Sequence, residues 1–163
     1  MKLDFKNWSD YHHQIYRIYH GIIAFSLIPF FLVFLELEVA DIKKERVSTA
    51  WIYVVLVILI PTCVLLMWSV WKGKGCSYRN LEDGQLKDKL IEFRRVEIKK
   101  YLISELTCIL GLLGLWLTAH YLFVIIYFAV LAQFSFLRPS EDRLVRNMRL
   151  TKEERKRLHQ GNM

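Results

Sequence analysis

The sequence predicts an all-α integral membrane protein that crosses the bilayer four times, as two antiparallel helical hairpins with amphipathic cytoplasmic helices. Of its 163 residues, 54% are hydrophobic and 24% are charged. Long uncharged runs alternate with segments that hold nearly all of the charge, a pattern typical of polytopic membrane proteins. The mean hydropathy of +0.23 is high for a soluble protein that carries this much charge.

The first half of the chain contains two apolar runs of the length that crosses a bilayer. The first run covers about residues 19–37. The second covers residues 51–71 and has Trp51 and Trp71 at its ends, where indole rings settle at the level of the lipid headgroups. Each run is therefore expected to form one membrane span.

A proline lies near the middle of each of these two runs, Pro29 in the first and Pro61 in the second. Because proline removes a backbone hydrogen bond, we expect a kink in both helices. The paired kinks could form a gate or a ligand niche, or they could belong to static packing.

The third apolar stretch, residues 101–137, is about twice as long as one span requires. It is expected to form two helices, at about residues 101–118 and 121–137, that fold back on each other in lipid. The turn is predicted at the only group of polar residues near the middle, Thr118, Ala119, His120 and Tyr121.

The distribution of basic residues predicts the orientation in the membrane. Twenty of the 23 Lys and Arg residues lie before the first run, in the loop 72–100 and in the tail 138–163. The positive-inside rule places these segments, and so both termini, on the cytoplasmic side. A multi-pass protein of a plasma membrane is expected, with the bacterial inner membrane as the default.

The cytoplasmic segments carry helix signals of their own. Residues 85–100 show apolar residues at helical spacing and cations on the other face, which predicts an amphipathic helix running directly into the third span. The tail 138–163 has a capping box at Thr151 to Glu154. We therefore expect a transmembrane domain over residues 1–137 and a basic helical tail over residues 138–163.

Small residues recur at intervals of three and four along the third span. Such a stripe lets two helix backbones approach closely in lipid. It predicts either packing within the chain's own hairpin or an interface for a helix of a partner protein, and its members are Ser104, Thr107, Gly111, Gly114 and Thr118.

Two polar side chains stand out inside the last two spans, Glu105 and Gln133. Each lies fourteen positions from Ala119, so the hairpin should bring them to the same depth. Gln133 could then donate a hydrogen bond to Glu105 as a structural clasp, or Glu105 could handle protons or cations in a transport path.

Basic residues that flank membrane spans are expected to contact anionic lipid headgroups rather than nucleic acid, because no nucleic-acid-binding module is recognisable. The residues expected to do so are Arg94, Arg95, Lys99, Lys100, Arg138, Arg143, Arg146 and Arg149.

No catalytic, cofactor or metal motif is recognisable, and His12, His13 and His20 lack the spacing for one ion. The leading hypothesis is a non-enzymatic accessory or scaffold subunit that associates with other membrane proteins, or with copies of itself, in a larger complex. A small oligomeric transporter or channel that uses Glu105 is the first alternative. A haem-binding electron carrier is the second.

Overall fold

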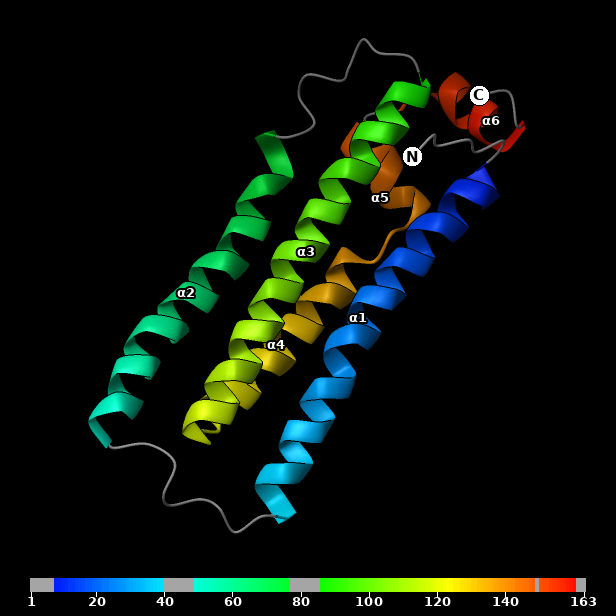
Figure 1. Cartoon of the computed structure of the whole chain (residues 1–163). Helices are drawn as coiled ribbons and strands as arrows, with labels where there is room; N and C mark the ends of the chain where they lie inside the picture. The colour runs from blue at the N-terminus through cyan, green and yellow to red at the C-terminus, as the bar shows by residue number, and fades with distance from the viewer. Residues whose placement is uncertain (1–7, 40–48, 77–85, 149, 161–163) are drawn as a thin grey trace.

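The computed structural model describes residues 8–39, 49–76, 86–148 and 150–160, and every element in these ranges is an α-helix (Figure 1). The elements in chain order are α1 (Trp8–Val39), α2 (Thr49–Cys76), α3 (Leu86–Thr118), α4 (Leu122–Leu137), α5 (Glu141–Met148) and α6 (Lys152–Gln160). The predicted all-α class is confirmed. The expected loop helix and third span form one continuous helix, α3.

Three of these helices, α1, α2 and α3, are long and apolar enough to cross a membrane. Helix α4 is as apolar but has only 16 residues. It reaches the length of the other candidate spans only when α5 is counted with it, and the two helices are bent by 76° relative to each other. The described part of the chain therefore holds three to four candidate spans.

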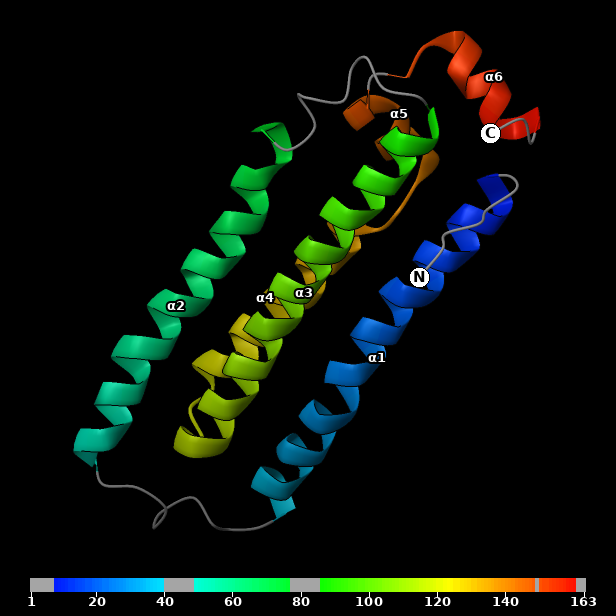
Figure 2. The ribbon, with the colours of Figure 1, turned by 45° about the horizontal axis from the view of Figure 1, so that its top comes forward.

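The α3–α4 hairpin lies in the middle of the molecule, and α1 and α2 pack on α3 from opposite sides (Figures 1 and 2). Its turn falls at the predicted place. Ala119 follows the last residue of α3 with a φ of 50°, and its amide donates to the Leu115 carbonyl oxygen at 2.7 Å. This left-handed residue closes the helix end in the way that glycine usually does.

Aromatic residues from α1, α3 and α4 fill the core of the hairpin. The rings of Phe30 and Tyr127 stack with centroids 3.8 Å apart. The Tyr19 hydroxyl group donates to the Phe134 carbonyl oxygen at 2.9 Å, and that of Tyr101 donates to the Leu137 carbonyl oxygen at 3.1 Å. The last carbonyl groups of a helix have no partner within the helix. These two hydroxyl groups supply partners for such carbonyl groups at the end of α4.

Most of the small-residue stripe of α3 lies inside the molecule, and Thr118 at its end is half-buried. Ser104 and Thr107 are buried, and a Cβ atom added to Gly114 would lie 2.3 Å from the Phe123 ring. On another side, the Cys63 thiol group of α2 lies 4.0 Å from the Thr107 carbonyl oxygen. Of the two predicted roles, packing within the chain's own hairpin is the one these contacts support, because the chain's own helices already cover most of the stripe.

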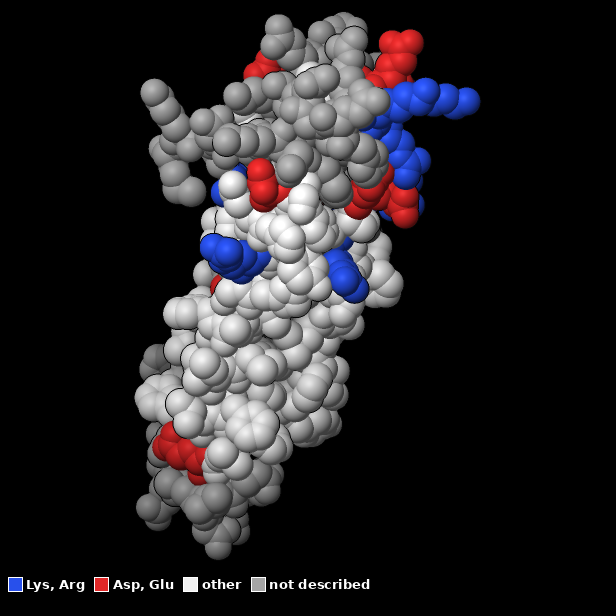
Figure 3. Space-filling model, turned by 90° about the vertical axis from the view of Figure 1, so that its right-hand side faces the viewer, with Lys and Arg blue, Asp and Glu red and all other residues white. Residues whose placement is uncertain are grey.

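The N-terminal turns of α1 and α3 join α5 and α6 in a cap at one end of the molecule. A second apolar cluster holds the cap together, with Tyr11, Ile15, Leu90, Phe93, Val96, Leu144 and Met148 as its buried members. Charged side chains gather at this end, whereas the face below it is uncharged down to an acidic group near the opposite end (Figure 3).

Candidate functional site

Helix α3 carries two buried carboxyl groups, and the nearer one to the cap, Glu97, has ionic partners. Its side chain is fully buried, and it pairs with Lys100 of the same helix at 3.2 Å and with Arg143 of α5 at 3.0 Å. Arg143 also donates to the Phe136 carbonyl oxygen at 3.4 Å. Two cations thus compensate one buried anion, and the arrangement ties α5 to α3.

A second ionic contact anchors α6 to α3. Lys89 Nζ lies 2.7 Å from Glu154 Oε1, and the Thr151 amide donates to Glu154 Oε2 at 2.8 Å. Partial burial alone would raise the pKa of Glu154, but the hydrogen bonds from Lys89 and Thr151 outweigh it and hold that pKa below its usual value. The Thr151 hydroxyl group in turn accepts from the Glu154 amide, which completes the predicted capping box.

Three of the residues expected to contact lipid headgroups lie in the interior instead. Arg94 is buried and donates to Gln14 Oε1 at 3.0 Å, and Lys100 and Arg143 are the buried partners of Glu97. The prediction was wrong for these three because each cation faces an acceptor side chain of the protein. The bond to that acceptor replaces a contact with a lipid headgroup. Arg95, Lys99, Arg138 and Arg146 are exposed, and Arg149 lies outside the described residues.

The second carboxyl group of α3, Glu105, has no such partners. Its side chain is 6% exposed, and neither carboxyl oxygen has a hydrogen-bond partner among the described residues. The Ser26 hydroxyl group of α1 makes a weak side-chain contact with Glu105, but its proton is directed to the Ile23 carbonyl oxygen at 3.2 Å. A buried polar group without a partner is rare in proteins and marks a candidate functional site.

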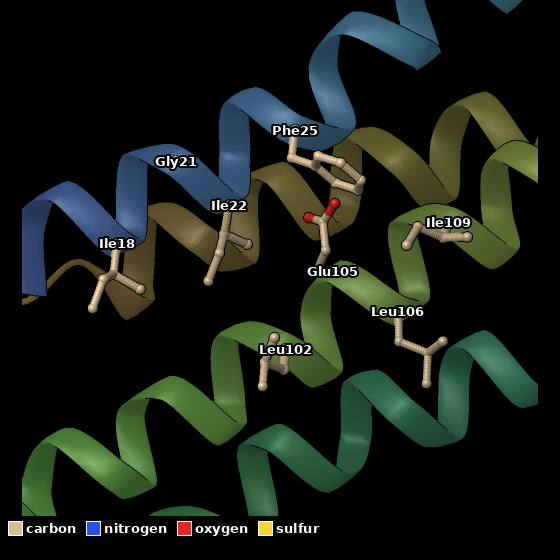
Figure 4. A pocket seen from close by; sticks show the side chains of 8 residues that line it. All are labelled: Ile18, Gly21, Ile22, Phe25, Leu102, Glu105, Leu106 and Ile109. Atoms are coloured by element: carbon tan, nitrogen blue, oxygen red, sulfur yellow. The ribbon is translucent and has the colours of Figure 1, made fainter. Parts of the chain in front are cut away.

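Glu105 faces a pocket of about 570 Å³ between α1 and α3. Its carboxyl group points toward α1, between Ile22 and Phe25 (Figure 4). Apart from Glu105 the lining is apolar or glycine, and it consists of Ile18, Gly21, Ile22, Phe25, Leu102, Leu106 and Ile109. The pocket therefore combines an apolar wall with one hydrogen-bonding group.

The predicted clasp between Glu105 and Gln133 is wrong. Gln133 donates to the Met67 carbonyl oxygen of α2 at 3.4 Å, whereas Glu105 faces α1. The two residues lie on opposite sides of the hairpin, because equal distance from the turn determines depth but not the direction in which a side chain points.

Two further polar residues near Glu105 were not singled out from the sequence. Cys108 and Tyr127 lie within electrostatic range of Glu105, and the Tyr127 hydroxyl group has no hydrogen-bond partner among the described residues. A tyrosine in an apolar run is usually interpreted as core or interface, so only the tertiary structure indicates that it shares a site with Glu105.

Helices α1 and α2 continue through Pro29 and Pro61 without interruption. The His12 ring stacks on Tyr16 with centroids 5.4 Å apart, and His12 Nε2 lies 3.3 Å from the Pro139 carbonyl oxygen. These contacts fix His12 at the junction between α4 and α5.

No family model matches the chain, and neither a curated protein nor a solved structure is significantly similar to it. The fold alone therefore defines the class of protein: in its described part, a helical chain with three to four helices long and apolar enough to cross a membrane, consistent with a multi-pass membrane protein.

Proposed function

We propose that this chain is a non-enzymatic accessory subunit of a larger membrane protein complex, with four membrane spans and both termini in the cytoplasm. The cap, formed by the starts of α1 and α3 with α5 and α6, would be its docking platform. The proposal rests on the continuity of α3, a single helix of 33 residues that begins in the cap and continues as a candidate span. A partner bound to the cap would therefore be connected rigidly to the membrane helices.

The four-span topology rests on α4. With 16 residues it extends about 24 Å at a rise of ~1.5 Å per residue, close to the ~30 Å thickness of the hydrocarbon layer. It returns along α3 to the end that carries the cap (Figures 1 and 2). An even number of spans keeps the basic tail on the same side as the basic loop, in agreement with the positive-inside rule.

The outer surface of the cap supports a docking role. A buried ion pair at Glu97 and a partly buried one at Glu154 fix its helices, so less conformational entropy is lost in the cap when a partner binds. Among the described residues, its surface exposes the carboxylates Asp10, Asp88, Asp142 and Glu153 and the cations Arg95, Lys99, Arg146, Lys152, Arg155 and Lys156. We infer that the partner presents an acidic surface to the cations.

The proposal is tested by the size of the assembly extracted in mild detergent from the native membrane. The wild-type chain should migrate well above the size of its own 19.5 kDa plus the micelle. The double variant Arg146→Glu, Lys156→Glu should release it from the assembly. A matched control, Ser135→Glu on the exposed side of α4, lies outside the cap and should leave assembly through the cap intact.

A wild-type chain that migrates alone, also after chemical crosslinking in intact membranes, would contradict the accessory role. So would a charge-reversed variant that stays fully assembled.

Glu105 has no hydrogen-bond partner among the residues that the structure describes, which favours a second candidate, a small transporter. It predicts a pH-dependent ion flux in proteoliposomes that Glu105→Gln abolishes. Equal flux for the wild type and this variant would exclude the carboxyl group from the path.

A further inference from the structure

The pocket between α1 and α3 contains a buried carboxyl group for which the described residues provide no hydrogen-bond partner. Burial without a partner costs free energy, and the cost is largest for an ionisable group. Glu105 is nevertheless 94% shielded and directed into the pocket (Figure 4). A molecule that brings a donor into this space would remove the cost.

The shape of the pocket limits what this molecule can be. Ile18 to Phe25 on α1 and Leu102 to Ile109 on α3 each extend about 10 Å at ~1.5 Å per residue, and the volume of about 570 Å³ lies within the range of small-molecule sites. Gly21 leaves one wall open, since a Cβ atom added there would have no neighbour within 4 Å.

The charge of the lining limits the head group. Glu105 is the only charged residue among the eight that line the pocket. An ammonium group supplies three N–H donors and the positive charge that would balance an ionised Glu105, since the lining contains no cation. A phosphate next to that ammonium group would find no positive side chain in the lining, which disfavours a phospholipid head.

We propose that the α1–α3 pocket binds a single-chain amphiphile with a primary ammonium head and no phosphate, with the head at Glu105 and the chain along Phe25, Leu106 and Ile109, which lead away from the cap. The site is independent of the docking proposal above, because none of its residues belongs to the outer surface of the cap.

The test uses the full-length protein, purified in nonionic detergent, and hexadecylamine with a photoactivatable diazirine in its chain. Labelled residues are located by tandem mass spectrometry, and half-saturation is measured by titration. Labels should concentrate on residues 18–25 and 102–109. A hexadecyl chain with a trimethylammonium head, which has no N–H donor, should require a roughly tenfold higher concentration or more.

Three variants separate the parts of the site. Gly21→Leu should fill the pocket and abolish saturable labelling. Ala24→Leu, on an exposed position of the same helix outside the lining, should leave it unchanged. Glu105→Gln should remove the preference for the primary amine over the trimethylammonium head. Equal melting temperatures would show that these variants fold alike.

Labelling that spreads over the outward faces of α1 and α2 and ignores Gly21→Leu would overturn the proposal. Equal binding of the two heads by the wild-type protein would overturn it as well. A wild-type dimer that Gly21→Leu converts to a monomer would show instead that a second copy occupies the pocket. The first two results leave the assembly experiment on the cap unaffected. A dimer formed through the pocket would be distinguished there because Arg146→Glu, Lys156→Glu would leave it intact.

Discussion

Arg143 of α5 is paired with Glu97 of α3 at 3.0 Å, although 46 positions separate them in the chain, and both side chains are almost completely buried. The pair lies at the junction where the cap meets the apolar helices. Because Lys100 shares the same carboxylate, the three residues act as one unit that holds α5 across the end of α3.

Removing the carboxylate should be strongly destabilising. Glu97→Ala leaves two buried cations without their anion, and we expect a loss of about 3–5 kcal/mol in the free energy of unfolding, measured by denaturant titration in detergent. The control Arg95→Ala breaks a largely exposed pair with Glu92 and should cost less than about 1 kcal/mol. Similar losses for both variants would show that burial of the pair is unimportant.

The two stripe glycines should respond differently to alanine. A Cβ atom at Gly114 overlaps the Phe123 ring, so Gly114→Ala should destabilise the protein by about 1–3 kcal/mol. At Gly111 the nearest side-chain atom, Ile126 Cγ2, would be 3.9 Å away, so Gly111→Ala should be tolerated. Thermal unfolding measures both. Adding Phe123→Leu should partly rescue Gly114→Ala, and an absence of rescue would contradict the predicted overlap.

Ala119 occupies a backbone conformation that costs an L residue about 1–2 kcal/mol. We expect Ala119→Gly to stabilise the hairpin by roughly 0.5–1 kcal/mol, after allowing for the greater freedom of glycine in the unfolded chain. Ala129→Gly, within α4, should have the opposite effect and raise the unfolded fraction at a given denaturant concentration. Both can be compared by midpoint shifts in the same denaturant series.

The proposed topology predicts the accessibility of two introduced cysteines in a chain with its three native cysteines replaced. With a membrane-impermeant maleimide on intact cells, Tyr121→Cys in the hairpin turn should react, and Lys156→Cys in α6 should react only after permeabilisation. Both parent side chains are exposed, so burial does not account for the difference. The reverse pattern would refute the proposed orientation, and labelling of both in intact cells would refute the fourth span.

The anchor of α6 should weaken in acid. Glu154 has a folded-state pKa below its unfolded value, so its contribution to stability is complete above the unfolded pKa and disappears as the pH falls through the folded pKa. Amide exchange of residues 152–160, corrected for the intrinsic rate, should therefore increase between neutral pH and about pH 3. Glu154→Gln should remove this dependence, and an unchanged profile in the variant would contradict the assignment.

Most of the helical framework could be predicted from the sequence. The runs at 51–71 and 101–137 carry a strong apolar signal. The length of the run 101–137 requires a turn, and its polar residues at 118–121 place that turn near Ala119. The start of α1 at Trp8 was missed by about eleven residues, because its first turns mix polar and aromatic residues and lack an apolar run.

The candidate site was less predictable. Glu105 stands out in the sequence because an ionisable residue in an apolar run is rare. Its pocket depends on Ile18 and Gly21, which lie about 80 positions away and carry no signal of their own. Arg94, Lys100 and Arg143 look like any other interfacial cation, and their burial depends on what neighbouring helices place beside them.

The sequence by itself determined that the chain is helical and where its long apolar helices lie, because segregation of charge and the length of an apolar run are local properties. The tertiary structure alone decided which face of each helix is covered: Gly114 against Phe123, Gln133 toward α2, and Glu105 toward α1, with no hydrogen-bond partner in the described part of the chain. The reason is physical. Burial and pairing depend on the rotation of each helix relative to its neighbours, and that rotation follows from side-chain packing between segments far apart in the chain.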